Sequence, residues 1–372
     1  MYLLYIFCLL PILIGYIVKI FNPRIQWREW MIGALAAFLL ALPIHYWSYH
    51  GQVGDYETWS GKITSAQFIP RWHEYYEYAV YRTEFTYDEK GNINGSYQVF
   101  DHWEEATRWH EQYWMAYSNI NTSYNISESK YKYFVKNFKN ESKERGDRTT
   151  SEHNSRMISG DPYDYVTYLK DDFVEPITDT RYFVNRIKAA KSVFNFVTPP
   201  KEIQVFDYPQ NADVWRSNRL LGTAPKDFDI RLVDEMNARL GPTKRVNVII
   251  IGFNSSDSSL AEWQRSKWIG GKKNDLVICY GTKWVKAFGW SESDICKRNI
   301  ETLFLQNNKT NDLLKLLEAE IWSNYKKREF TEDFQYLTIE PEFKHWMVFI
   351  ILMILIQGGL YVAFHHENLF KN

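Results

Sequence analysis

The chain has 372 residues, which is enough for two folded domains together with several membrane-spanning segments. Its 44 Lys and Arg are matched by 45 Asp and Glu, so the net charge of -1 argues against a nucleic-acid partner. The sequence contains no C-x-x-C spacing, which removes the common cysteine-based zinc sites from consideration.

Three apolar runs predict membrane-spanning helices at residues 1–18, 30–49 and 346–364. Each is close to the ~20 residues that cross a hydrocarbon core of about 30 Å. Trp30 and Trp346 lie at the ends of their runs, where interfacial aromatic residues are expected. A cleaved signal peptide is the alternative for the first run, although no basic residue precedes it and no small-x-small cleavage site ends it.

Basic residues in the loop 19–29 predict the orientation of these helices. Lys19, Arg24 and Arg28 lie between the first two runs, so this loop should be cytoplasmic. Residues from about 50 to 344 should then lie outside the cytoplasm, and the tail 365–372 should return inside. The sequence therefore predicts an integral protein of the inner or plasma membrane, with the lipid bilayer as one partner and a large periplasmic part.

Residues 50–138 are predicted to form a β-rich, aromatic domain. The segments 76–87 and 96–100 are rich in aromatic and β-branched residues and flank a Gly- and Asn-rich turn, which predicts a hairpin. Ring pairs across strands explain the aromatic content better than binding of single-stranded nucleic acid, because acidic residues match the basic ones. His73, His102 and His110 are interpreted as structural residues in preference to metal ligands.

Residues 139–180 are predicted to be a polar linker, because residues 139–160 contain almost no large apolar side chains. Residues 181–226 are predicted to be a helix and a connector. Phe183, Ile187 and Phe194 recur in that segment at helical spacing.

Residues 227–340 are predicted to form an α/β domain. A helix should end at Gly241-Pro242 and be followed by an apolar strand at 246–253. A capping box that starts at Ser259 should open a second helix, which runs to about Trp268 and precedes an apolar strand at 275–280. This β-α-β order predicts parallel strands, followed by an antiparallel strand at 283–288 and two helices. Two cysteines lie in this domain, Cys279 and Cys296. They could form a disulfide or could simply be buried as free thiols.

The stretch 268–275, which we call the joint, contains two glycines and two lysines and could therefore be a phosphate-binding loop. A phosphate-binding loop runs from a strand through glycines into a helix. In the joint, Gly270 and Gly271 instead follow a helix and precede a strand. They are therefore predicted to cap the helix C-terminus, where the helix dipole favours Lys272 and Lys273 over a phosphate.

Three carboxylates remain as catalytic candidates. No histidine lies between residues 153 and 345, which excludes a Ser-His-Asp triad within the α/β domain. Asp275, at the start of the second strand, could meet Glu292 and Asp294, because the third strand returns to that end of the sheet. Such a group would suit a divalent cation such as Ca²⁺, although the favoured interpretation needs no cofactor.

The joint resembles the corresponding segment of TPM-type domains, which occur in membrane-associated and extracytoplasmic proteins. The residues that carry the resemblance are Trp268, Gly270, Gly271, Lys272, Lys273, Asn274 and Asp275. The resemblance implies an α/β sandwich and a role in phosphatase activity, calcium binding or modulation of membrane partners. The chain departs from the family after the second strand, where Gly281-Thr282-Lys283 stand in place of the usual acids and arginine.

The chain is also similar to a group of membrane proteins of bacteria and tailed phages that has no assigned activity. The shared motifs are E-x-W-x-G-x-I/V-T at 57–64, N-x-I-K-A at 185–189, G-K-K-N-D at 271–275 and a single C-terminal span.

The sequence thus predicts a protein of mixed α+β and α/β class. Transmembrane helices flank an extracytoplasmic β-rich domain and a TPM-like α/β sandwich. We expect a membrane-anchored interaction or modulator protein of the cell envelope, encoded by a bacterium or a phage, with another envelope protein as its partner and no catalysis. The alternative is a metal-dependent phosphoester hydrolase of TPM type that uses Asp275, Glu292 and Asp294.

Overall fold

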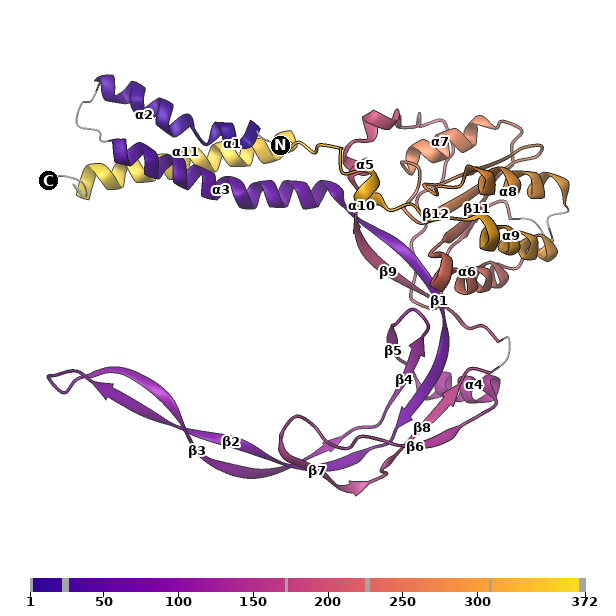
Figure 1. The fold of residues 1–372 in the computed structure, drawn as a ribbon, viewed down its shortest axis with the longest axis horizontal. Helices are drawn as coiled ribbons and strands as arrows, with labels where there is room; N and C mark the ends of the chain where they lie inside the picture. The colour runs from indigo at the N-terminus through magenta and orange to yellow at the C-terminus, as the bar shows by residue number, and fades with distance from the viewer. Residues whose placement is uncertain (1–2, 22–26, 171–172, 225–227, 308–309, 368–372) are drawn as a thin grey trace.

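The computed structural model describes residues 3–21, 27–170, 173–224, 228–307 and 310–367. Figure 1 shows a helical bundle built from both ends of the chain, a group of long antiparallel strands, and an α/β unit. The predicted boundary at 227, Arg24 of the predicted cytoplasmic loop, and the tail beyond residue 367 lie outside the described residues.

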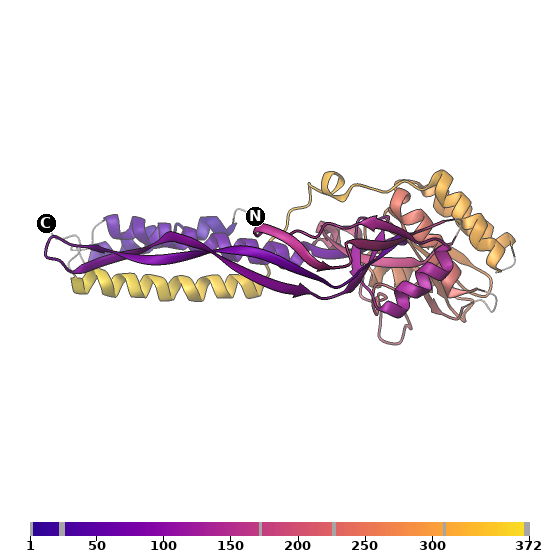
Figure 2. The same cartoon turned by 90° about the horizontal axis from the view of Figure 1, so that it is seen from below.

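The helices of the bundle lie side by side, as Figures 1 and 2 both show. They are α1 (Leu3–Phe7), α2 (Leu10–Phe21), α3 (Trp27–Val53) and α11 (Phe343–Glu367). They pack around a small apolar cluster that includes Cys8, Ala37 and Phe349. Gln357 of α11 donates a hydrogen bond to the carbonyl oxygen of Gly33 in α3, at 2.8 Å.

Among the described residues, two helical segments are long and apolar enough to cross a membrane: Trp30–Val53 and Phe343–Leu360. The first apolar run, predicted as one span, is divided into α1 and α2. Pro11 explains the division, because its ring and its missing N–H disfavour a helical turn that includes the carbonyl of Phe7.

Helix α3 leads without a loop into the strand β1 (Gly54–Ile69), which pairs with strands along its whole length. The first half of β1 pairs antiparallel with β9 (Pro176–Val184). Its second half pairs with β4 (Tyr113–Ser118) and β8 (Tyr163–Tyr168). The short strands β5 (Ser123–Asn125) and β6 (Ser142–Arg145) extend this sheet at its two edges.

Helix α4 (Glu128–Phe138) covers one face of this sheet and buries Phe134 and Phe138 against it. It begins at Ser127, whose side chain accepts a hydrogen bond from the amide of Lys130, and ends at Lys139 in the left-handed conformation.

A two-stranded ribbon, which we call the arm, consists of residues 72–110. It is formed by β2 (Trp72–Tyr87) and β3 (Ile93–His110). The strand β7 (His153–Gly160) pairs with β2 only at residues 72–77, which we call the root of the arm. Figure 1 shows the arm extending in the same direction as the helical bundle. The hairpin predicted between these strands is confirmed, and its strands are longer than predicted.

Two expectations for the middle of the chain are wrong. Residues 139–180, predicted as a polar linker, contain β6, β7, β8 and the start of β9. The polar β6 and β7 lie at sheet edges, where strands need no apolar side chains, and β8 lies inside the sheet between β1 and β6. Residues 181–184, predicted as helical, end β9 through their pairing with β1. Only α5 (Arg186–Ala189) and a 3₁₀ turn η1 (Lys191–Phe194) follow.

The α/β unit has a four-stranded sheet in the order β10-β11-β12-β13. The strands are β10 (Leu220–Gly222), β11 (Asn247–Gly252), β12 (Asp275–Tyr280) and β13 (Val285–Phe288). The helices are α6 (Ile230–Lys244), α7 (Ser259–Lys267), α8 (Asp294–Gln306), α9 (Asn311–Asn324) and α10 (Phe330–Asp333). The predicted parallel pair β11–β12 and the antiparallel β13 are confirmed.

Three local predictions about this unit need correction or completion. Helix α6 continues through Gly241-Pro242 and ends at Lys244, because a proline in the last turn removes only one internal hydrogen bond. The predicted capping box is not formed, and Asp257 instead accepts the amide hydrogen bond of Ser259. Both cysteines of the unit are buried and unpaired, on opposite faces of the sheet.

Candidate functional site

The joint begins where α7 ends. Ile269, Gly270 and Gly271 have positive φ angles of 53°, 79° and 89°, and the amide of Gly270 donates to the carbonyl of Arg265 at 2.8 Å. A Cβ on Gly270 would lie 2.7 Å from the ring of Trp290. The predicted glycine cap at a helix C-terminus is therefore confirmed.

The lysines of the joint hold the α/β unit against β1. Lys272 pairs with Asp55, and the ammonium of Lys273 lies 3.0 Å from Glu57, whose side chain is 3% exposed. Asn274 donates to a main-chain carbonyl of β1 at 2.7 Å. The two ammonium groups thus face carboxylates on a strand that is distant in the sequence. The sequence argument, which considered only the helix dipole, did not predict these partners.

Asp275 lies beneath this contact and is fully buried. Its carboxylate accepts hydrogen bonds from Asn247 at 2.8 Å, from the hydroxyl of Tyr208 at 3.0 Å and from the amide of Lys272 at 2.7 Å. Burial raises the pKa of Asp275, and these hydrogen bonds oppose the rise. The carboxylate is therefore an internal anchor for the joint, enclosed by protein donors.

The structure gives the other two predicted carboxylates partners of their own. Glu292 lies 2.5 Å from the ammonium of Lys326, and Asp294 lies 2.7 Å from that of Lys297. Within the described part of the chain, no three His, Cys, Asp or Glu side chains gather as a metal ion would require. Hydrolysis at these residues stays a prediction.

The three sequence motifs at 57–64, 185–189 and 271–275 converge on the first half of β1. Glu57 of the first motif binds Lys273 of the third. The amide group of Asn185, from the second motif, donates to Asp55 at 2.9 Å, and Lys188 donates to the carbonyl of Gly54. The motifs therefore describe one structural contact between segments that are far apart in the chain.

A polar cluster at the arm's root was missed from the sequence. Glu74 is fully buried and accepts hydrogen bonds from Arg108 at 2.6 Å and from His110 at 2.7 Å. The hydroxyls of Thr150 and Ser155 complete the cluster, at 2.5 and 2.6 Å. No local signal could have revealed it, because two members lie in the segment predicted as a linker.

His110 of this cluster stacks on Trp72, with ring centroids 4.1 Å apart. His73 stacks in the same way on Trp109, and His102 bonds Asp101. The three predicted structural histidines thus have separate partners.

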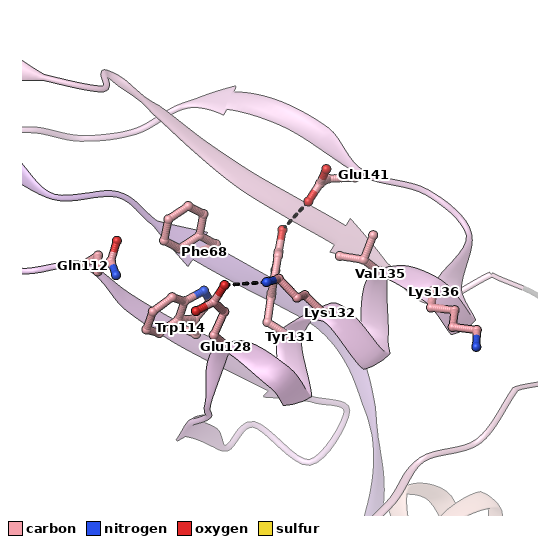
Figure 3. A pocket seen from close by; sticks show the side chains of 9 residues that line it. All are labelled: Phe68, Gln112, Trp114, Glu128, Tyr131, Lys132, Val135, Lys136 and Glu141. Atoms are coloured by element: carbon pink, nitrogen blue, oxygen red, sulfur yellow. Dashed lines mark hydrogen bonds and ion pairs between the residues drawn. The ribbon is translucent and has the colours of Figure 1, made fainter.

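A concave site, which we call the aromatic pocket, lies between α4 and the sheet and has a volume of about 380 Å³ (Figure 3). Its apolar wall includes Phe68 and Trp114, whose rings stack with centroids 5.3 Å apart. Tyr131 lies behind them, and its hydroxyl is shared between Glu141 at 2.8 Å and a main-chain carbonyl at 2.9 Å. Burial raises the pKa of this phenol, so it remains a neutral donor.

The rim of the aromatic pocket is polar and carries both signs of charge. Figure 3 shows Gln112, Glu128, Lys132, Lys136 and Glu141 around the opening. Glu128 and Lys132 form an ion pair at 2.6 Å. None of the nine lining residues is a Ser, Cys or His, so the lining contains no Ser-His or Cys-His pair. The arrangement suits recognition of an apolar group with polar neighbours.

Sequence reasoning did not find this pocket, because its lining comes from four separate segments of the chain. Comparison with known proteins adds no further assignment. No protein-family model matches the chain, and no match is found among curated proteins or among solved structures.

Proposed function

We propose that the chain is a membrane-anchored binding protein of the cell envelope whose aromatic pocket receives an apolar side chain of another envelope protein. The observation that carries this proposal is the pocket itself, which is concave, lined by stacked rings and bordered by polar groups of both signs. Pockets of this volume and composition are the usual form of binding sites.

The two apolar helical segments of the bundle support the anchoring part of the proposal. Large apolar side chains such as Leu35, Leu39 and Leu355 are exposed on the bundle, as lipid-facing residues would be. In the proposed topology the loop 19–29 is cytoplasmic and the strands and the α/β unit are extracytoplasmic, where a TPM-like unit would act as a modulator.

The polar residues of the joint favour binding over catalysis. Asp275 is enclosed by three donors, and Lys272 and Lys273 are engaged by β1. These groups hold two parts of the molecule together. The aromatic pocket, in contrast, presents its side chains at an open surface.

The position of Gln112 allows a direct test, because it lies on the rim and in the two-residue link between β3 and β4. A photoreactive amino acid replaces Gln112 in the full chain, which is irradiated in native membranes. We expect a discrete adduct with one envelope protein, and we expect Trp114→Ala to remove it by deleting half of the ring stack.

Two controls make the result specific. The same photoreactive residue at Lys315, an exposed position of α9, should give no such adduct, and Trp322→Ala on α9 should leave the Gln112 adduct intact. The proposal fails if both positions give the same adducts, or if Trp114→Ala has no effect.

A further inference from the structure

The arm beyond its root has one uncharged, aromatic face. The pairing of Tyr81 with Phe100 and of Tyr87 with Ile93 places these residues on one side of the ribbon, because side chains alternate along a strand. We call this side the aromatic face, and its large side chains are Tyr81, Phe85, Tyr87, Ile93, Phe100 and Trp103. The residues between them are small or uncharged, such as Thr83 and Gln98.

The opposite side of the arm is charged. Arg82 lies 2.8 Å from Glu84 and 3.6 Å from Asp101, and Asp101 also bonds His102. Between residues 79 and 103 the ionic contacts of the arm therefore lie on one side, where the hydroxyl of Tyr97 also donates to Glu84.

The aromatic face is exposed to an extent that a monomer rarely tolerates. Its six large side chains are 45–61% exposed, and none of them belongs to an apolar cluster of the described residues. A two-stranded ribbon is marginally stable by itself in water, and a contiguous apolar patch usually marks an interface. The ring of His153 in β7 stacks on Trp103, with ring centroids 4.0 Å apart.

From these observations we infer that the aromatic face packs against the same face of a second copy of the chain. Aromatic side chains bury about 150–250 Å² each, so the five half-exposed rings together with Ile93 offer roughly 600 Å² per copy. Two copies would then bury roughly 1,200 Å², which is the lower limit for specific interfaces. From Ala79 to Tyr87 the face carries no charge, so the contact itself brings no like charges together, and the acidic side of each ribbon stays in solvent.

The charge of the arm disfavours a lipid surface as the occupant. Residues 72–110 contain eight Asp and Glu against three Lys and Arg, a net charge of -5, which anionic headgroups repel. The open edges of a ribbon are also excluded from hydrocarbon. Figure 1 shows the arm extending in the same direction as the bundle and separate from it.

This inference rests on the arm alone and is independent of the aromatic pocket. The test measures the mass of the full chain in detergent over a range of micromolar concentrations. We expect a reversible dimer. Phe100→Asp should raise its dissociation constant at least about 30-fold, as loss of a central aromatic residue typically does.

Val99→Asp is the matched control, because Val99 pairs with Arg82 on the charged side. It should leave the dimer intact. Hydrogen exchange at residues 72–80 shows whether each variant retains the ribbon. Thr83→Lys is a second variant that should weaken the dimer, because it places a charge on the aromatic face while all its large side chains stay in place.

Several outcomes would overturn the inference. A wild-type chain that stays monomeric, a dimer that survives both Phe100→Asp and Thr83→Lys, or equal weakening by Val99→Asp would each do so. Binding of the monomer to phosphatidylcholine vesicles that Phe100→Asp abolishes would assign the face to lipid instead.

Discussion

Replacing Glu74 with Gln should loosen the root of the arm. The carboxylate is fully buried and joins β2 to β3 through Arg108 and His110, and to the start of β7 through Thr150 and Ser155. Glutamine keeps the size of the side chain. It removes the charge and puts a donor where one acceptor oxygen stood.

The sign of the effect and its pH dependence follow from the pKa of Glu74. Burial by itself would raise this pKa, but the hydrogen bonds from Ser155, Thr150, His110 and Arg108 outweigh it and lower the pKa from 4.5 to about 2. Because the folded value is the lower one, the carboxylate stabilises the root above about pH 4.5, and this contribution is lost as the pH falls toward 2. At neutral pH we expect this contribution to be on the order of 1.5–3 kcal/mol, the range for hydrogen bonds to a charged group.

Hydrogen exchange measured by mass spectrometry on the full chain in lipid nanodiscs tests this value. At pH 7, amides of residues 72–80 and 104–110 should exchange about 10- to 100-fold faster in Glu74→Gln, since about 1.4 kcal/mol corresponds to a factor of ten. Glu84→Gln is the matched control, because Glu84 lies on the outer arm and pairs with Arg82 at the surface. The strand β11 serves as an internal reference.

The pH dependence provides a second check on the same reasoning. After correction for intrinsic exchange rates, the difference between wild type and Glu74→Gln should shrink as the pH falls from about 4.5 toward 2. Equal protection of the two proteins at pH 7, or a difference that does not depend on pH, would refute the assigned role of the carboxylate.

Three further predictions concern the rest of the molecule. Gly241→Ala should lower the unfolding free energy by about 1–3 kcal/mol, since the added Cβ would lie 2.1 Å from the carbonyl oxygen of Ser60. Gly51→Ala is the control and should not destabilise the chain, because the space around Gly51 is open. Thermal melts compare the two variants, and equal melting temperatures would contradict the expectation. Asp275→Asn should destabilise the α/β unit by about 1–3 kcal/mol in chemical denaturation, because it changes a buried acceptor of several hydrogen bonds. If the wild type hydrolyses a phosphomonoester in the presence of Ca²⁺ and Asp275→Asn abolishes this activity, the result would instead support the hydrolase. Gln357→Leu removes one hydrogen bond between α11 and α3 and should cost about 0.6 kcal/mol in detergent unfolding; a loss above about 2 kcal/mol would show a larger role.

Features with a local physical cause were predictable from the sequence. The buried strands of the α/β unit appear as continuous apolar runs, and the hairpin of the arm appears as two strand-like segments around Gly91 and Asn92. The cap at Gly270 and Gly271 follows from their place between a helix and a strand. In each case neighbouring residues alone determine the conformation.

Features that depend on distant partners were not predictable. β6 and β7 lie in a polar stretch, and only their pairing with β8 and β2 makes them strands. Residues 181–184 have helical spacing, yet the pairing of β9 with β1 outweighs this weak local preference.

The candidate sites show the same division most clearly. Sequence order placed the carboxylate of Asp275 at the start of a strand, but only the tertiary structure decided that it is buried among Asn247, Tyr208 and the amide of Lys272. It also decided that Lys272 meets Asp55, 217 positions away in the chain. The sequence by itself determined the apolar runs, the hairpin and the parallel strands, because backbone conformation responds to adjacent residues. The tertiary structure decided the partners of charged and aromatic side chains, because these interactions depend on distance in space.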